Sequence, residues 1–447
     1  MTETKIGAVI FAMSMMLCTG CSQQTADGYL LKHADLPEQA VYPKEDEYVK
    51  DNGDFDYDTY DTDLENWMEC SSLKREKMQV YEGKLNTYLS SSVSALMSHT
   101  EGENRVCSPV NIFFALGMMA EITDGSTRQE ILGALGFDAL EELRSCAQAL
   151  FEADYNDDGL LTQIPGASLW LNDDLSFNED TLNSLALYYY VSVYHGDVND
   201  EGFTEAFRQW LNEMTNGLLE DSVNELEPFT EDSVLTLASS VYFSGSWTDS
   251  FAYEGTYTEV FNGTQGEEET EFMHRCTGGK AVILDDCMYT DLSFNGGSCL
   301  RIILPDEDTD AETLLSSGIF EKVLNNDDAG AEYMINLSLP KFDLQSELDL
   351  IPVMQEMGIQ QVFTSDADFS SLTDNADVSL TSAKHNARLK VDEDGCEAAA
   401  YTVMMVGTTA LLPEGDQLDF NCSRPFLFAL ISADGLPLFT GIVNQIG

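Results

Sequence analysis

The amino-acid sequence predicts an α+β fold. Three features of the 447 residues support this prediction: helical periodicity dominates the first part of the ordered chain, strand patterns dominate the second part, and a β-hairpin signal stands near the C-terminus. Helices and strands that are separated along a chain favour α+β over alternating βαβ units. A hydrophobic fraction of 43% is enough to bury a sizeable core.

The N-terminus has the pattern of an export signal. Lys5 is followed by residues 6–18, which carry no charge and are too few to span a bilayer. Residues 1–20 resemble a bacterial lipoprotein signal that is cleaved before Cys21, whose thiol then carries lipid. We therefore expect an exported protein that a lipid anchor alone holds at the cell surface; ordinary secretion and a chance apolar start are the alternatives.

Charge and cysteine content exclude several kinds of site. The chain has 79 acidic and 21 basic side chains and a formal charge of −58, so its surface repels phosphates and we expect no nucleic acid partner. Once Cys18 has left with the signal and Cys21 is acylated, the remaining cysteines form no Cys-x-x-Cys pair, and the five histidines are scattered. We therefore predict no metal site and no cofactor. Disulfide pairing stays open, because an exported protein allows it and a large core does not require it.

Residues 21–78 are polar and acidic and show no sustained hydrophobic period, so we predict an acidic flexible tether there. Four carboxylates in it match ligand positions of a calcium-binding loop: Asp54, Asp56, Asp58 and Glu65. Thr59 occupies the position at which such a loop needs glycine. Because the chain has 79 carboxylates, we interpret the match as an accident.

Residues 79–447 form a single predicted domain, and its first part is helical. Apolar residues recur at helical spacing at Leu85, Leu89, Val93 and Leu96. Ser108 followed by Pro109 is a cap and a first-turn proline, so the apolar run after them is predicted to be the next helix. Thr127 and Glu130 form a capping box that predicts the start of a third helix.

Strand patterns follow the helices. Residues 234–243 and 300–304 are apolar runs that we predict to be strands. A further strand is indicated by alternating apolar residues: Ile335, Leu337 and Leu339. Residues 425–431 and 436–443 flank an Asp-Gly pair at 434–435, which is a strong signal for a hairpin. The strands therefore belong mostly to the second part of the domain.

Residues 398–413 carry no charge, although 22% of the chain is charged. In an extended conformation one face of this region is small or apolar throughout: Cys396, Ala398, Ala400, Thr402, Met404 and Val406. No proline interrupts the segment before Pro413. The segment is therefore suited to become a buried strand, whereas its alanines alone give it little tendency to be one.

A set of spaced motifs covers the chain from about Val80 to Gly447. They are Ser108-Pro109, Gly125 with Thr127, Trp210 with 215–217, 241–247, 339–342, 357–359 with Phe363, His385, 391–400, 424–426 and 439–441. Together they make the chain resemble a serpin, a member of a family of serine protease inhibitors. The resemblance implies helices around a large central mixed β-sheet, smaller sheets and an exposed reactive loop at about residues 393–414. It also implies a monomer that is not an enzyme.

The resemblance implies a metastable fold in which a protease cuts the reactive loop as bait, after which the loop inserts into the main sheet as an added strand. The hinge of that loop maps to Glu393, Gly395, Cys396, Glu397, Ala398, Ala399 and Ala400. The small hinge side chains cost little to bury, which favours an inhibitor over a non-inhibitory cell-surface lipoprotein that binds a ligand or partner. Cys396 is either a small filler or a thiol whose oxidation hinders insertion.

By the family's usual spacing from Glu393, the reactive bond joins Thr409 and Ala410, and the neighbouring bonds are alternatives. No lysine or arginine lies near this bond, so a trypsin-like protease is a poor target. The small residues fit an elastase-like or subtilisin-like serine protease, which is the predicted partner. Leu411 leaves a chymotrypsin-like target open, and a papain-like cysteine protease is a further alternative.

The resemblance gives two further sets of residues a structural role. Ser108, Asn111 and His385 match a hydrogen-bonded cluster beneath the strands that open. Trp247 matches the tryptophan of the breach, where insertion begins. Asn111 stands where serine is commoner and Ser239 replaces a frequent asparagine, so the usual hydrogen bonds of the cluster are in doubt. The cluster is not predicted to be a catalytic triad, because the chain has no Gly-x-Ser-x-Gly motif.

Overall fold

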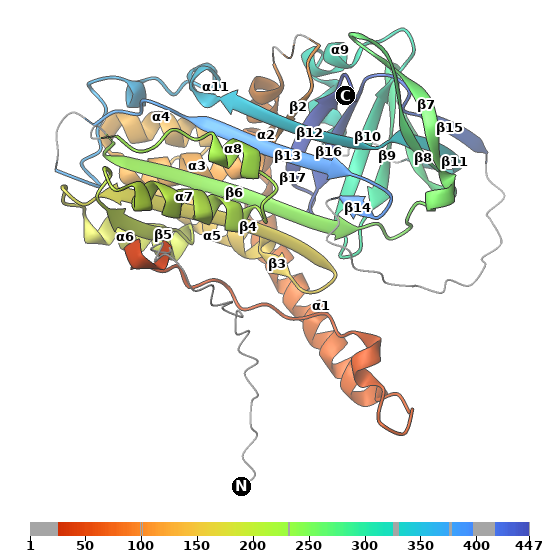
Figure 1. Cartoon of the computed structure of the whole chain (residues 1–447), viewed down its shortest axis with the longest axis horizontal. Coiled ribbons are helices and arrows are strands. Elements are labelled where there is room, and N and C mark those ends of the chain that lie inside the picture. The colour runs from red at the N-terminus through yellow and green to blue at the C-terminus, as the bar shows by residue number, and fades with distance from the viewer. Residues whose placement is uncertain are drawn as a thin grey trace.

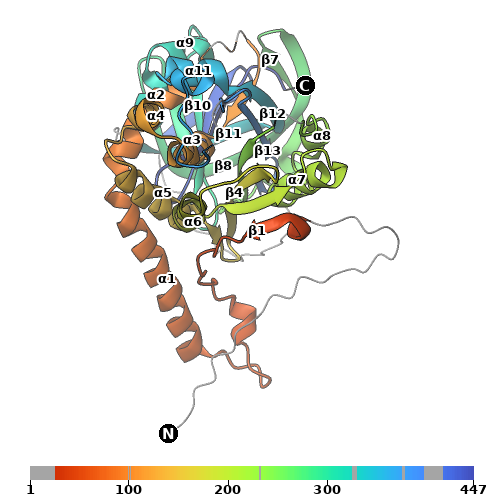
Figure 2. The same ribbon diagram turned by 90° about the vertical axis from the view of Figure 1, so that its left-hand side faces the viewer.

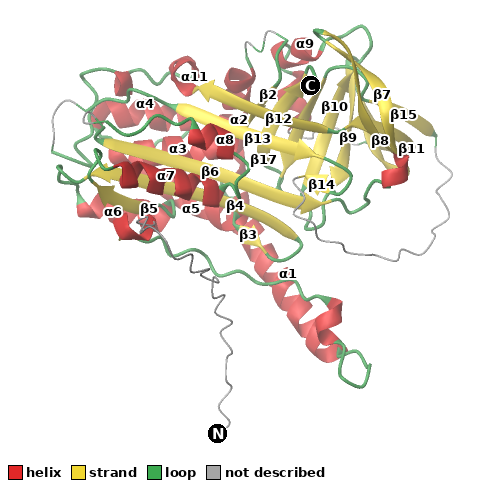
Figure 3. Cartoon of the chain, in the orientation of Figure 1, coloured by secondary structure: helices red, strands yellow, loops and turns green. Residues whose placement is uncertain are grey.

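The computed structural model describes residues 26–98, 100, 102–230, 233–324, 330–374, 378–396 and 416–446. In these residues two β-sheets lie next to each other, and helices cover the main sheet (Figure 1 and Figure 3). The lipidation residue Cys21, hinge residues 397–400 and the reactive-bond residues Thr409 and Ala410 lie outside the described residues.

The main sheet has eight strands in the described part of the chain, in the order β1-β5-β4-β6-β14-β13-β12, with β3 paired to β4. The strands are β1 Leu30–Lys32, β3 Asn156–Asp157, β4 Leu161–Asn172, β5 Ser192–Gly196, β6 Leu235–Ser246, β12 Phe342–Asp349, β13 Lys384–Val391 and β14 Gly395–Cys396. The sheet is mixed, because β4 and β5 are parallel whereas β4 and β6, like β12 and β13, are antiparallel.

The second sheet has nine described strands, in the order β15-β11-β8-β9-β10-β16-β17-β2, with β7 paired to β8. They are β2 Arg105–Cys107, β7 Thr256–Gly263, β8 Gly266–Ile283, β9 Cys287–Ser293, β10 Cys299–Pro305, β11 Ala331–Pro340, β15 Gln417–Asn421, β16 Phe426–Ile431 and β17 Pro437–Val443. The predicted hairpin is confirmed, since β16 and β17 pair around Gly435, which has a φ of +83°.

Helices cover both faces of the main sheet. The α-helices in the described residues are α1 Tyr57–Gln79, α2 Glu82–Met97, α3 Pro109–Ile122, α4 Gly125–Leu135, α5 Leu140–Asp154, α6 Glu179–Tyr188, α7 Glu201–Met214, α8 Glu220–Asn224, α9 Ala311–Ser316, α10 Ile319–Leu324 and α11 Leu350–Glu356. Figure 2 shows α7 and α8 on one face and α3, α5 and α6 on the other. Almost every residue of α3 is buried, so this helix is the centre of the core.

The three predicted helices are present, and the predicted start at Ser108 is confirmed. Helix α2 contains the apolar residues at 85, 89, 93 and 96, and Ser108 caps α3 by accepting a hydrogen bond from the backbone N–H of Asn111 at 3.2 Å. The predicted capping box of Thr127 and Glu130 is wrong, because helix α4 already begins at Gly125 and its N-cap is Asp124. Thr127 Oγ1 accepts from the backbone N–H of Asp368 at 3.0 Å, and Glu130 likewise accepts from a distant backbone N–H, so both side chains join the helix to another segment.

The N-terminal segment differs from the predicted tether over residues 21–78. β1 pairs with β5 and is the edge strand of the main sheet, and Ala26 is buried in a cluster with Trp170 and Tyr194. Helix α1 packs along α5, with Trp67 Nε1 donating to Asp158 at 2.9 Å and Lys77 Nζ 2.6 Å from Glu152. These contacts are mainly polar, and Met78 is the only residue of α1 that is fully buried. An attachment of this kind leaves no hydrophobic period in the sequence, which explains the difference.

No helix in the described ranges is both long enough and apolar enough to cross a membrane.

Candidate functional site

The two described hinge residues lie in a slot of the main sheet. Gly395 pairs with Ser246 of β6, and Cys396 pairs with Gly245 of β6 and with Val391 of β13. Among the described strands β6 and β13 do not pair with each other, and β14 alone joins them, at one end. The sheet is therefore split between β6 and β13, and the start of the loop already occupies the entrance of the split.

Residue size decides which hinge can enter this slot. A Cβ atom at position 395 would lie 2.1 Å from the carbonyl oxygen of Gly245, so only glycine permits this approach of two backbones. Cys396 is fully buried, and it is small and apolar enough to fill the space beside β13. Gly395 and Cys396 therefore fit the slot without displacing β6 or β13.

The residues just before β14 are fixed by charge and by backbone hydrogen bonds. Lys341 Nζ lies 3.3 Å from Glu393 and 3.0 Å from Glu271. The carbonyl of Glu393 accepts a hydrogen bond from the backbone N–H of Phe251 at 3.3 Å. Burial opposes ionisation of Glu393, but its hydrogen bonds and the charge of Lys341 outweigh that effect, so the pKa of this carboxyl is lowered. Glu393 is therefore an anchored anion at the entrance of the slot.

Trp247, directly after β6, closes the same entrance. Its indole Nε1 donates to the carbonyl of Asp392 at 2.9 Å, and its backbone N–H donates to the carbonyl of Asp394 at 3.1 Å. The indole is buried and stacks on Phe294, with ring centres 4.4 Å apart and planes at 14°. Trp247 therefore holds the chain on both sides of Glu393.

The predicted cluster lies beneath the middle of the slot. The backbone N–H of Ser108 donates to Nε2 of His385 on β13 at 2.9 Å. The amide of Asn111 donates to the carbonyl of Ser239 on β6 at 3.2 Å, and the hydroxyl of Ser239 donates back to the Asn111 side chain. The N-terminus of α3 thus bridges the two strands that border the slot.

This cluster holds two departures from the family pattern that compensate each other. Asn111 and Ser239 exchange the serine and the asparagine that the family usually places there, and the pair still forms hydrogen bonds. Burial lowers the pKa of His385 to about 4, so its imidazole is neutral and Nε2 is free to accept from Ser108. The cluster therefore ties both strands that border the slot to the N-terminus of α3.

A turn after α7 spans the slot on the opposite face. The amide of Asn216 donates to the hydroxyl of Tyr242 on β6 at 3.1 Å, and Arg388 on β13 donates to the carbonyl of Leu218 at 2.9 Å. Asn216 has a φ of +50°, which asparagine tolerates better than most residues. A strand that enters the slot must break these contacts. We call these two contacts, Asn216 with Tyr242 and Arg388 with Leu218, the clasp. The sequence did not predict the clasp, because its partners are far apart in the chain.

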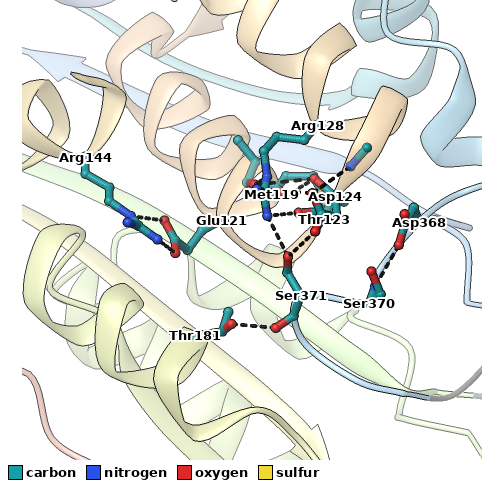
Figure 4. Close-up of polar contacts among 12 residues, drawn as sticks. Met119, Glu121, Thr123, Asp124, Arg128, Arg144, Thr181, Asp368, Ser370 and Ser371 are labelled. Atoms are coloured by element: carbon teal, nitrogen blue, oxygen red, sulfur yellow. Dashed lines mark hydrogen bonds and ion pairs between the residues drawn. The ribbon is translucent and has the colours of Figure 1, made fainter. Parts of the chain in front are cut away.

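A separate polar cavity of about 460 Å³ lies among α3, α4, α5 and α6 (Figure 4). Arg144 binds Glu121 through two hydrogen bonds of 2.8 and 2.5 Å, and Arg128 donates to Ser371 at 2.6 Å and to the carbonyl of Ala120 at 3.0 Å. Both guanidinium groups already have protein partners here. We therefore assign the cavity to helix packing.

The comparisons with known proteins agree with this geometry. The family model "Serpin (serine protease inhibitor)" matches residues 85–446. Neuroserpin of Mus musculus is 27% identical over 366 residues, which cover 77% of this chain and 86% of the relative. Alpha-1-antiproteinase 2 of Equus caballus is 28% identical over 356 residues, which cover 75% and 80%.

Solved structures show the same fold. The thermophilic serpin Tengpin in its native state has a TM-score of 0.72 and 23% identity, with 81% of this chain and 94% of that chain covered. The complex of thyroxine-binding globulin with thyroxine has a TM-score of 0.71 and 22% identity, with coverage of 81% and 99%. The predicted α+β arrangement of helices around a large mixed sheet is confirmed. The matched region begins after α1, so the N-terminal segment is additional to it.

Proposed function

The chain belongs to the serpin family, and we propose from that premise that it inhibits a protease by covalent trapping in a single turnover. The nucleophile of the protease attacks the carbonyl carbon of Thr409, the peptide bond to Ala410 breaks, and Ala410 leaves as a new amino terminus. The carbonyl group of Thr409 then remains covalently bound to the nucleophile of the protease as an acyl group. Insertion of the loop then moves the trapped protease before water can release it.

The observation that carries this proposal is the slot between β6 and β13 with the start of the loop already inside it. An added strand that continues from β14 would be antiparallel to both neighbours. It would complete backbone hydrogen bonds along both, which supplies the driving force for insertion. The residues that would point inward are the small or apolar ones of the uncharged segment, from Cys396 to Val406.

The target class follows from the bait bond. Small residues around Thr409 and Ala410, and the lack of a nearby cation, support an elastase-like or subtilisin-like serine protease. The formal charge of −58 favours fast association with cationic proteases. The association rate should therefore fall as salt is added, and a rate that does not change with salt would argue against this steering.

We place the inhibitor outside the cytoplasm, on the cell surface, with Cys21 as the lipid attachment site. The signal-like residues 1–20 support this part of the proposal. Replacing Cys21 by serine should release the protein from membranes into the medium, which fractionation of cells that express the full chain would measure.

The proposal is tested by incubating the protein with elastase or subtilisin and separating the products on a denaturing gel. The expected result is a complex that survives denaturation, in a ratio near one to one, together with loss of protease activity. Clean cleavage of the loop with full survival of the protease would favour a non-inhibitory, ligand-binding serpin instead. The solved complex of thyroxine-binding globulin with thyroxine has the same fold and contains a bound ligand, so it is the specific observation that supports this second candidate.

Two arginine substitutions make the test specific for insertion. Thr402→Arg places a charge on the face that would be buried, so we expect cleavage without trapping. Tyr401→Arg places the same charge on the other face and should keep the complex. Equal trapping by both variants would contradict insertion as the inhibitory step.

A further inference from the structure

Exposed apolar side chains are concentrated in the N-terminal segment, residues 26–80, which precedes the region that the serpin family model matches. Thirteen large hydrophobic or aromatic side chains are exposed among the described residues, and eight of them belong to this segment. The eight are Leu31, Leu36, Val41, Val49, Tyr57, Met68, Leu73 and Val80. The segment has only 55 of the 447 residues, so this concentration indicates a surface that meets a partner.

The N-terminal segment lies on one side of the molecule. Figure 1 and Figure 2 both show β1, α1 and the chain that joins them beneath the body, whereas β7 lies on the opposite side. The joining chain is held in place, since the backbone N–H of Tyr42 donates to the carbonyl of Asp158 at 2.9 Å. We call the surface that residues 26–80 form the N-terminal face.

The first described residues are fixed to the domain. Ala26 is buried in a cluster with Trp170 and Tyr194. The hydroxyl of Tyr29 donates to the carboxylate of Asp200, the N-cap of α7, at 2.6 Å. β1 follows directly and pairs with β5. Ala26 is therefore a fixed point of the N-terminal face.

The proposed lipid attachment site is close to this fixed point. Ala26 comes five residues after Cys21. Because an extended chain advances at most about 3.5 Å per residue, Ala26 lies within about 18 Å of the lipidated residue. The lipid is inserted in the bilayer, so the N-terminal face must lie near the membrane surface.

The far end of α1 is ordered and presents an aromatic ring. Tyr48 packs edge-on against Tyr60, with ring centres 5.3 Å apart, and its hydroxyl donates to Asp63 at 2.8 Å. Phe55 lies beside Tyr57, with ring centres 4.7 Å apart, and Tyr57 is 68% exposed. Tyrosine is enriched in the headgroup region of bilayers, because its ring is apolar and its hydroxyl is polar. Tyr57 is therefore suited to a contact with lipid headgroups.

Charge decides which kind of membrane surface the N-terminal face fits. The segment has 15 acidic and 6 basic side chains. Anionic headgroups would repel these carboxylates, whereas headgroups without net charge leave the apolar contact favourable. The face therefore fits a bilayer surface that is neutral overall.

We propose that the N-terminal face rests on the bilayer that holds the lipid of Cys21, with its exposed apolar side chains at the boundary between headgroups and acyl chains. The inference rests on the lipid anchor of the proposed function, and it adds a second, non-covalent contact with the same membrane. The contact gives the inhibitor one orientation, with β7 directed away from the bilayer. β15, where the chain returns from the reactive loop, belongs to the same sheet as β7, so the loop is presented to proteases in the external medium.

The test places a fluorescent label at one position at a time on the full-length protein, lipidated on Cys21. Cys70→Ser and Cys276→Ser first remove the two cysteines that are exposed among the described residues. Leu36→Cys or Tyr257→Cys then provides the site for the label. The two native side chains are similarly exposed, at 48% and 52%, but Leu36 belongs to the N-terminal face and Tyr257 to β7.

The labelled protein is bound to phosphatidylcholine vesicles in which some lipids carry a nitroxide quencher on the headgroup. A label at position 36 should lose about half of its fluorescence or more, whereas a label at position 257 should lose about a tenth or less. Equal quenching at both positions would reject the inference while the anchor stands. Vesicle binding no stronger than that of Cys21→Ser would show that the anchor fails, and the inference would fail with it.

Two glutamates test the apolar contact itself. In a protein with Val49→Glu and Tyr57→Glu, quenching at position 36 should fall by about twofold or more, because a carboxylate is costly at the acyl boundary. Val260→Glu with Ile283→Glu, on β7 and β8, is the matched control and should leave the quenching unchanged. Unchanged quenching in the first variant, with the protein still on the vesicles, would show that the N-terminal face does not touch the bilayer.

Discussion

At the scale of single residues, a neutral histidine makes one hydrogen bond that ties β13 to the N-terminus of α3. His385 accepts from the backbone of Ser108 through Nε2, and burial lowers its pKa to about 4 from an ordinary value of 6.5. The folded state therefore resists protonation that the unfolded chain accepts. The exchange between Asn111 and Ser239 is visible in the sequence as two separate departures, but only the fold shows that they are partners.

The first prediction concerns the pH dependence of this histidine. Because its pKa is lower in the folded state, His385 should reduce the free energy of unfolding as the pH falls from 6.5 to about 4, by up to about 3 kcal/mol. His385→Gln keeps an acceptor but has no proton to take up, so its stability should lack this contribution. Denaturant unfolding at several pH values measures the difference between the two proteins. Parallel pH profiles for both would contradict the assignment.

The second prediction concerns Gly395. Gly395→Ala places a Cβ atom 2.1 Å from the carbonyl oxygen of Gly245, so the hinge should leave the slot. We expect at least about tenfold more loop cleavages for each trapped protease. The reason is that slower insertion gives water more time to hydrolyse the acyl-enzyme and release the protease. Gly83→Ala, on α2 where nothing lies within 4 Å, is the control and should leave the ratio unchanged. The ratio is read from a titration of protease against inhibitor.

At the scale of secondary-structure elements, the function depends on two strands that are kept apart and fastened from both faces. Helix α3 bridges β6 and β13 below the slot, and the turn after α7 spans it above. Periodicity and capping residues predicted α2, α3 and the hairpin of β16 and β17. They could not predict the clasp or the attachment of α1, because these depend on polar contacts between distant segments.

The third prediction concerns the clasp. Tyr242→Phe removes the hydroxyl that accepts from Asn216 while keeping the ring, so the barrier to insertion should fall by about 1 kcal/mol. Conversion of the uncleaved protein to an inserted form on mild heating should then be about fivefold faster, which native gel electrophoresis over time measures. Tyr57→Phe, on the exposed first turn of α1, provides the control. Equal conversion rates in all three proteins would show that the clasp does not limit opening.

At the scale of the whole molecule, inhibition by loop insertion requires that the intact structure is not the most stable arrangement of its own chain. The uncharged segment and its small inward-facing residues were readable from the sequence, because burial of a strand restricts charge and size. The slot that would receive it was not readable, since an unfilled position between β6 and β13 is a property of sheet topology. The ion pair between Lys341 and Glu393 was not readable from the sequence either, because it joins distant segments of the chain.

The most direct test of this account is a crystal structure of the protein after a protease has cut the reactive loop. We predict that the segment from Cys396 to Val406 forms a new strand between β6 and β13, antiparallel to both, with the side chains of the even-numbered residues directed into the core. A cut molecule in which β14 still ends near Cys396 and the slot remains open would contradict the central claim.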